Sequence, residues 1–226
     1  MITDALRAWV VHKYWSGDTS ARVIFFTEEH GLIHGLWKGG RTPKKQALLQ
    51  AFIPLWLVMD ARGDAHFVRH LEVADTPLYP SGQGLFACLY VNELLHHALR
   101  PNDAHVTLHK SYQKTLEALS TSTERYFIEV VLRRFEQTLL MSCGYQMRFT
   151  HEAHSTKPII DALYYRFIPG EGFVCAETGI LGAHVIAIGE DRLDDVAVLR
   201  DAKRIMRCAI DHALEGKDIR ARALYR

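Results

Sequence analysis

Five short runs rich in β-branched and aromatic residues occupy the first 79 residues of this chain. They span residues 6–14, 21–27, 32–37, 52–59 and 67–73. Turn-forming segments rich in glycine and charged residues separate them, as expected between β-strands. Five short strands in about 80 residues suit a small closed barrel, and five is the number in an OB-fold. We therefore expect residues 1–79 to form an OB-fold domain.

The pattern changes after residue 79, where prolines and glycines interrupt the chain. Helices are expected over residues 85–99, 103–119, 122–143 and 196–214. The first is apolar on nearly every side, which is typical of a helix buried inside a domain. Asp103 is the expected N-cap of the second helix. Residues 145–190 predict a loop-rich or short-stranded insert, so the chain is expected to be α+β, with a helical domain at 80–226.

Composition excludes several protein classes. Hydrophobic residues make up 48% of the 226 residues, so a packed core is expected. No apolar run approaches the length of about 20 residues that a membrane span needs. The N-terminus does not resemble a signal peptide, and the four cysteines are widely separated, which favours free thiols. The sequence predicts a cytoplasmic protein without a cofactor.

A basic loop at residues 38–45 stands out in a chain whose formal net charge is only +1. It contains Lys38, Arg41, Lys44 and Lys45, and residues 30–59 contain no Asp or Glu. Cations on a mobile arm, with no carboxylates to repel phosphate, suit a polyanion binder. Trp37 beside the loop and Trp15 in a nearby turn are the aromatic residues most expected to be exposed for base stacking. The alternative interpretations are a solvated turn and buried aromatic rings.

The last predicted helix carries a second set of cations. Arg200, Lys203, Arg204 and Arg207 share one face because they are three or four residues apart. They form either an anion-binding face or a solvated face balanced by Asp201 and the acidic residues at 190–195.

Arg133 and Arg134 lie in the middle of the third predicted helix, beside apolar residues. Adjacent helical residues point about 100° apart, so at most one of them faces a given groove. The other is expected to be solvated or paired with Glu129 or Glu136. An arginine beside an apolar groove would suit a peptide that ends in acidic and aromatic residues.

The motifs of common enzymes are missing from the sequence. Neither the phosphate-binding GxxxxGK[ST] loop nor a GxSxG nucleophile motif occurs. His151, His154 and Cys175 could supply three metal ligands, but no CxxC pair supports them, and surface histidines are the alternative. We expect a protein without catalytic activity or bound metal.

Several motifs resemble the bacterial RecO family of recombination mediators in order and spacing. The N-terminal domain carries Ala8-Trp9-Val10-Val11-His12 and Lys38-Gly39-Gly40-Arg41. Downstream follow Leu89-Tyr90-Val91-Asn92-Glu93-Leu94-Leu95, Leu132-Arg133-Arg134-Phe135-Glu136 and Leu199-Arg200-Asp201-Ala202-Lys203-Arg204. The resemblance covers essentially the whole chain. The four-cysteine zinc module of some members is not matched, since only Cys143 and Cys175 lie in or near that region.

The resemblance implies a DNA repair and recombination mediator that is not an enzyme. Such a protein binds single- and double-stranded DNA, anneals complementary strands, and acts with RecR and RecF to load RecA onto DNA coated by the protein SSB. A cytoplasmic, nucleoid-associated location follows from that role. By position, the implied DNA contacts are Trp37, Lys38, Arg41, Lys44 and Lys45. The implied contacts to the acidic SSB tail are Arg133, Arg134, Arg200, Lys203, Arg204 and Arg207. An RNA-binding OB-fold protein and a metal-dependent hydrolase are the alternatives.

Overall fold

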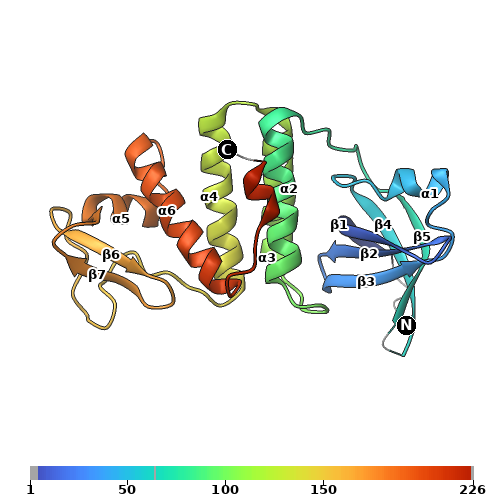
Figure 1. The fold of residues 1–226 in the computed structure, drawn as a ribbon, viewed down its shortest axis with the longest axis horizontal. Helices are drawn as coiled ribbons and strands as arrows, with labels where there is room; N and C mark the ends of the chain where they lie inside the picture. The colour runs from blue at the N-terminus through green and yellow to red at the C-terminus, as the bar shows by residue number, and fades with distance from the viewer. Residues whose placement is uncertain (1–4, 64, 225–226) are drawn as a thin grey trace. The chain divides into compact units, whose positions relative to one another are not determined.

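The computed structural model describes residues 5–63 and 65–224. A closed five-stranded barrel at the N-terminus is followed by helices and a small three-stranded sheet (Figure 1). This confirms the predicted α+β class. The chain divides into two compact units, one containing residues up to Thr123 together with those from Ile219 on, the other Glu124–Asp218. The predicted domain boundary after residue 79 stays a prediction.

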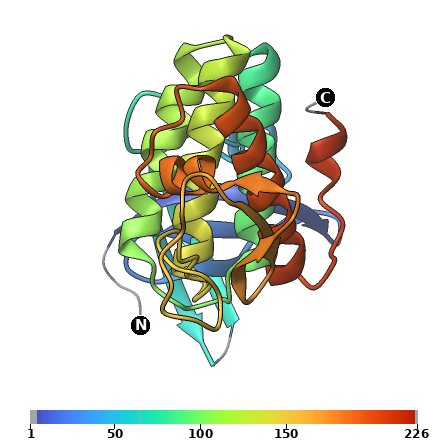
Figure 2. The same cartoon turned by 90° about the vertical axis from the view of Figure 1, so that its left-hand side faces the viewer.

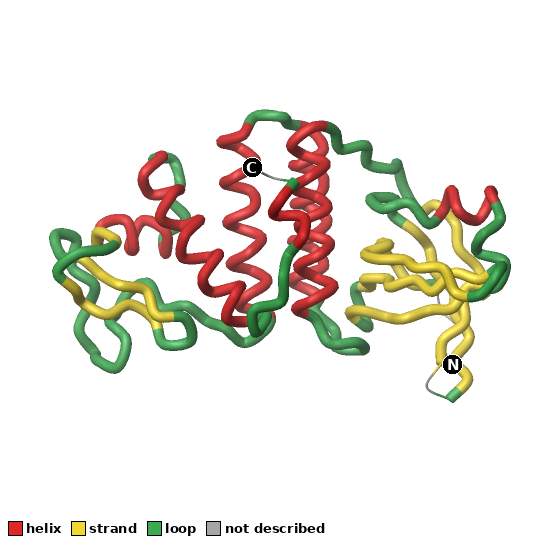
Figure 3. Tube along the Cα trace, viewed as in Figure 1, coloured by secondary structure: helices red, strands yellow, loops and turns green. Residues whose placement is uncertain are grey.

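The barrel contains all five predicted strands. They are β1 (Leu6–Ser16), β2 (Ser20–Thr27), β3 (Gly31–Trp37), β4 (Leu55–Arg62) and β5 (Ala65–Val73). Their order around the barrel is β1-β2-β3-β5-β4, and β3 and β5 are the parallel pair. Figure 3 shows these strands in yellow and the short helix α1 (Pro43–Leu48) between β3 and β4 in red.

The barrel interior is filled by apolar side chains that alternate along the strands, as the two-residue period of a strand requires. The buried core comprises Leu6, Ala8, Val10, Ala21, Val23, Phe25, Ile33, Trp37, Leu49, Leu55, Leu57, Met59, Val68 and Leu71. Trp37 belongs to this core and is only 5% exposed. The expectation of an exposed Trp37 is therefore wrong, because a barrel this small needs large side chains to fill it.

A β-bulge in β1 changes which side chains reach the barrel surface. Val10 pairs with Phe25 of β2, whereas His12 pairs with Ile24, so the register shifts between them. Paired residues point to the same face of a sheet. Val10 therefore points into the core with Phe25, and after the bulge His12 and Tyr14 point outward with Ile24 and Arg22.

Helices α2 (Gly82–Ala98) and α3 (Val106–Thr121) pack on the outside of the barrel and bury part of that face. The ring of Tyr112 on α3 makes edge-on contacts with Trp9 at 5.8 Å and Phe26 at 5.6 Å. Its hydroxyl donates to Asn92 Oδ1 at 2.8 Å. The short 3₁₀ helix η1 (Arg220–Ala223) contacts α2.

The predicted start of the second helix is wrong. Asp103 lies before the helix, and His105 occupies the N-cap position. The Asp103 carboxylate lies 3.5 Å from His105 Nε2 and does not cap a backbone amide.

The second unit contains α4 (Arg125–Ser142), β6 (Tyr164–Ile168), β7 (Gly172–Ala176), β8 (Ile180–Leu181), α5 (Gly182–Gly189) and α6 (Val196–Ala213). The insert forms the sheet β7-β6-β8, whose strands are short, as expected, and the short helix α5, which was not predicted. Figure 2 views this sheet with α5 and α6 from the side. No helix within the described part of the chain is long and apolar enough to cross a membrane.

Candidate nucleic-acid interface

A row of outward-facing side chains crosses four strands of the barrel. Tyr14 of β1 pairs with Arg22 of β2, Arg22 pairs with Leu36 of β3, and Leu36 pairs with Phe67 of β5. Direct pairing places all four on the same face. We call Tyr14, Arg22, Leu36 and Phe67 the outer row. The outer row presents the aromatic rings of Tyr14 on β1 and Phe67 on β5, with Arg22 on β2 between them. Such a surface suits stacked bases and phosphates.

Cations border the outer row at its β5 end. Lys38 Nζ lies 5.8 Å from the centroid of the Phe67 ring, and the Arg62 guanidinium lies 5.7 Å from the same centroid. Both cations are exposed. Asp60 of β4 pairs with Phe67 and lies next to the β5 end of the row. Its negative charge is balanced by Arg69, whose guanidinium lies 3.9 Å from the carboxylate. The sequence analysis missed Tyr14, Arg22 and Arg62, because only the strand register brings them together with Phe67.

The basic loop is anchored to the end of the barrel, which corrects the expectation of a mobile arm. The Arg41 backbone N–H donates to Thr19 O at 3.0 Å, and its Nη1 donates to Gly17 O at 3.0 Å. Lys45 Nζ donates to Lys38 O at 2.7 Å. Gly40 is required here because a Cβ would lie 2.9 Å from the Ala21 Cβ. The loop backbone is therefore held against the barrel, and the side chains of Arg41 and Lys45 each donate to a backbone carbonyl.

The loop places its four cations differently. The Arg41 guanidinium lies 5.4 Å from the ring centroid of Trp15, which is 44% exposed, as expected from the sequence. Lys45 lies over the buried Trp37 ring, 4.8 Å from its centroid. Lys44 is exposed. Trp15 thus offers the exposed ring that Trp37 does not.

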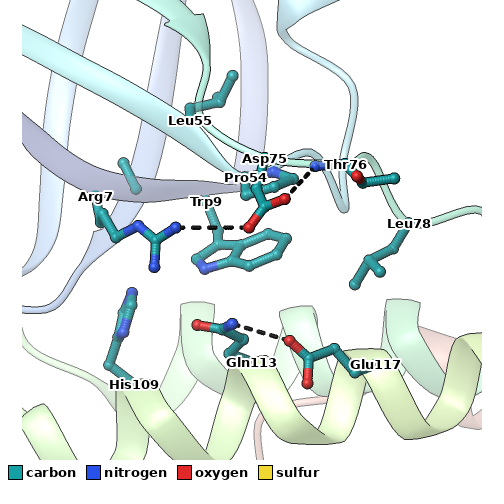
Figure 4. A pocket seen from close by; sticks show the side chains of 11 residues that line it. Arg7, Trp9, Pro54, Leu55, Asp75, Thr76, Leu78, His109, Gln113 and Glu117 are labelled. Carbon is teal, nitrogen blue, oxygen red and sulfur yellow. Dashed lines mark hydrogen bonds and ion pairs between the residues drawn. The ribbon is translucent and has the colours of Figure 1, made fainter.

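A cavity of about 190 Å³ lies elsewhere on this unit, between the barrel and α3 (Figure 4). Arg7 faces Asp75 across it at 3.8 Å, and Gln113 on α3 donates to Glu117 at 2.8 Å. Burial lowers the pKa of His109, although Glu28 and Glu29 act in the opposite direction. The lining carries the carboxylates of Asp75 and Glu117 against the guanidinium of Arg7, and the neutral His109 adds no positive charge. The lining therefore disfavours phosphate. The outer row remains the better candidate.

In the second unit, the guanidinium of Arg133 is buried and forms ion pairs with two carboxylates. Its guanidinium lies 2.7 Å from Glu136 Oε1 and 3.5 Å from Glu129 Oε2, and its residue exposure is 5%. Arg133 is therefore closed to an incoming peptide, and its expected place beside an open groove is wrong. Arg134 is exposed and pairs with Asp191 at 2.9 Å.

The four cations on the basic face of α6 also differ in their surroundings. Lys203 pairs with Glu129 on α4, whereas Arg200, Arg204 and Arg207 are exposed. Three of the acids that could have balanced them have other partners: Asp201 lies 2.8 Å from His184, Asp191 binds Arg134, and Asp195 caps α6 by accepting from Ala197 N at 2.6 Å. We call Arg200, Arg204 and Arg207 the α6 stripe.

A cavity of about 370 Å³ opens beside the C-terminal end of α4. Met141, Tyr145, Met147, Phe149 and Ile186 supply its apolar lining, and the exposed Arg148 supplies a cation. Arg134 lies one turn before Gln137, which also lines it. The sequence analysis missed Arg148, for which the aromatic and basic run after Gly144 was the signal.

The three residues proposed as metal ligands have separate surroundings. His154 Nε2 lies 2.9 Å from Glu171, His151 Nδ1 lies 2.9 Å from Thr150 Oγ1, and Cys175 is an exposed thiol. Among the described residues, no group of three or more His, Cys, Asp or Glu side chains could hold a metal ion.

Comparison with known proteins covers the whole chain. Residues 1–77 match the family model described as "Recombination protein O N terminal", and residues 81–223 match "Recombination protein O C terminal". A protein from Legionella pneumophila (strain Corby) named "DNA repair protein RecO" is 49% identical, over 100% of this chain and 99% of that protein. One of the same name from Actinobacillus pleuropneumoniae is 33% identical, over 100% and 95%. This chain therefore belongs to the RecO family of DNA repair proteins.

Proposed function

We propose that this protein is a recombination mediator that binds single- and double-stranded DNA and anneals complementary strands without catalysing a reaction. In this proposal it acts with RecR, and with RecF, to help load RecA onto DNA coated by SSB. A cytoplasmic, nucleoid-associated location belongs to the same proposal. The observation that carries it is the outer row with its bordering cations, on a chain that belongs to a DNA repair family.

We infer that DNA lies across the outer row. Bases stack on Tyr14 and Phe67, and on Trp15 at the barrel end, because every base has a π-face. Arg22, Lys38 and Arg62 contact phosphates, together with Arg41 and Lys44 of the anchored loop. Aromatic stacking and phosphate contacts do not read base edges, so binding should tolerate many sequences.

The test is fluorescence anisotropy of a labelled single-stranded oligonucleotide at several salt concentrations. We expect the triple variant Lys38→Ala, Lys44→Ala, Arg62→Ala to bind about 10- to 100-fold more weakly and to lose about 0.7 of the logarithmic salt slope for each phosphate contact removed. The matched control is Lys114→Ala, Lys157→Ala, Lys217→Ala, which removes the same charge from exposed positions elsewhere. If both triple variants weaken binding equally, the outer row is not the binding surface.

A competition arm separates DNA from RNA. Unlabelled single-stranded DNA and RNA of matched sequence are added to the preformed complex. A DNA repair role predicts that DNA competes at least as well as RNA. A clear preference for RNA would instead favour the RNA-binding alternative.

We further propose that the second unit binds the acidic, Phe-ending tail of SSB. The apolar cavity beside α4 is large enough for an aromatic side chain, and Arg148 and Arg134 can meet carboxylates close to it. The α6 stripe, Arg200, Arg204 and Arg207, supplies further cations for the acidic residues of the tail, with Lys203 beside it. Arg133 is excluded from this set because carboxylates already occupy it.

The tail proposal is tested by titrating a labelled peptide, with and without its terminal Phe, with this protein. We expect Arg148→Glu to reduce affinity by about 10-fold or more, since a like charge replaces an ion-pair partner. The double variant Arg204→Glu, Arg207→Glu separately tests the α6 stripe. Unchanged affinity in the double variant would remove the stripe from the site, and binding that ignores the terminal Phe would remove the cavity.

A further inference from the structure

Four histidines from three elements gather on the surface of the first unit. The His12 ring on β1 stacks on the His96 ring of α2, with centroids 4.9 Å apart and planes 13° apart. His97 lies next to His96, with ring centroids 5.0 Å apart. His34 of β3 and His12 both pair with Ile24, so they flank it on the outer face of the sheet. We call His12, His34, His96 and His97 the histidine cluster.

The histidine cluster borders the outer row. His12, Ile24 and His34 are paired across β1, β2 and β3. The next residues on the same face of these strands, two positions away, are Tyr14, Arg22 and Leu36 of the outer row. The His12 and Tyr14 rings are 6.3 Å apart. The bulge in β1 turns both side chains outward together. His12 and His34 are exposed, and His96 and His97 are partly buried, so all four can reach a polyanion that lies along this face.

The neighbouring histidines that act on His96 outnumber the carboxylates that could balance a proton on it. His12, His34 and His97 all act on His96 as like charges, and Glu93 is the carboxylate that acts in the opposite direction. Glu93 lies 3.8 Å from His97 and accepts hydrogen bonds from the backbone N–H groups of Arg220 and Ala221. Without an added anion, stacked imidazoles therefore resist protonation together.

Burial and the neighbouring histidines lower the pKa of His96 to about 4. The imidazole is therefore neutral at neutral pH. A phosphate group beside the cluster would favour the charged form of His96 and raise its pKa. Because binding and protonation are linked, an anion that raises this pKa also binds more strongly at lower pH.

We propose that the histidine cluster is a second phosphate-contact patch of the DNA-binding face, and that its imidazoles take up protons when DNA binds. The inference rests on the proposed DNA binding and adds to it a ligand contact and a dependence on pH. Neutral imidazoles would contribute little to binding at high pH. As the pH falls, they join the cations of the outer row and its borders.

The test is binding of a labelled oligothymidine at constant salt between pH 8 and pH 6. Thymine gains no proton in this range, so a proton taken up on binding belongs to the protein. We expect wild-type affinity to rise by up to about 10-fold per pH unit for each proton taken up. The variant His12→Gln, His34→Gln, His96→Gln should lose most of this rise with falling pH.

A control variant, His151→Gln with His154→Gln, changes two exposed histidines of the second unit and should keep the wild-type pH dependence. Titration calorimetry in two buffers with different ionisation enthalpies counts the protons directly. Equal pH dependence in all three proteins, with DNA binding intact, would overturn the inference. Absence of DNA binding at every pH would overturn the proposed function itself.

Discussion

Two neighbouring arginines show how much a single position in a helix decides. Arg133 and Arg134 have the same side chain and are adjacent in α4. One turns inward between two glutamates, and the other reaches solvent and pairs with Asp191. Their sequence context does not rank them, because the rotation of α4 depends on what packs against it. A buried ion pair depends strongly on both partners, while an exposed one contributes little.

Removing the buried guanidinium should therefore be far more costly than removing the exposed one. We expect Arg133→Met to lower the free energy of unfolding by about 3–5 kcal/mol, because Glu129 and Glu136 lose a buried partner. Arg134→Met should change it by at most about 1 kcal/mol. Urea unfolding followed by far-ultraviolet circular dichroism measures both.

If Arg133→Met is too unstable to purify, the triple variant Glu129→Gln, Arg133→Met, Glu136→Leu tests the same point. It replaces most of the charged network by groups of similar size and should recover stability relative to Arg133→Met. Equal stability of the two single variants would show that Arg133 is not buried between carboxylates in solution.

At the scale of elements, the sequence predicted the strands and helix ends that are determined by residues close together in the chain. The five barrel strands follow from short apolar runs between turns. Gly144 directly follows Cys143, the C-cap of α4, and has a left-handed φ of 85°, which glycine adopts readily. The α6 start at Val196 follows from Asp195, which accepts from the N–H groups of Ala197 and Val198. Such signals act within a few residues, so a single sequence carries them.

Features that depend on distant partners were not predictable in this way. The bulge that turns His12 and Tyr14 outward is set by the pairing of β1 with β2, and the outer row exists only because four strands share a register. Trp37 looks exposed beside a polar loop but fills the barrel. Helix α5 was not predicted, because a short apolar run such as Gly182–Gly189 cannot be told from a short strand by its pattern alone.

At the scale of the whole molecule, the first unit should be sensitive to acid. The folded state lowers the pKa of His96 to about 4, through burial and neighbouring histidines, and burial also lowers the pKa of His109. In the unfolded chain a histidine titrates near 6.5. Below that pH the unfolded state binds more protons than the folded state, so stability falls as the pH drops from about 6.5 toward 4.

We expect the free energy of unfolding of the first unit to fall by about 1–2 kcal/mol between pH 7 and pH 5 from His96 alone, after allowance for solvent screening. Tryptophan fluorescence reports this unit selectively, because all four tryptophans of the chain, Trp9, Trp15, Trp37 and Trp56, lie in it. Urea unfolding at several pH values should show a decline that His96→Gln reduces and His151→Gln does not. A decline that is the same in all three proteins would mean that the imidazole of His96 is as free to protonate in the folded unit as in the unfolded chain.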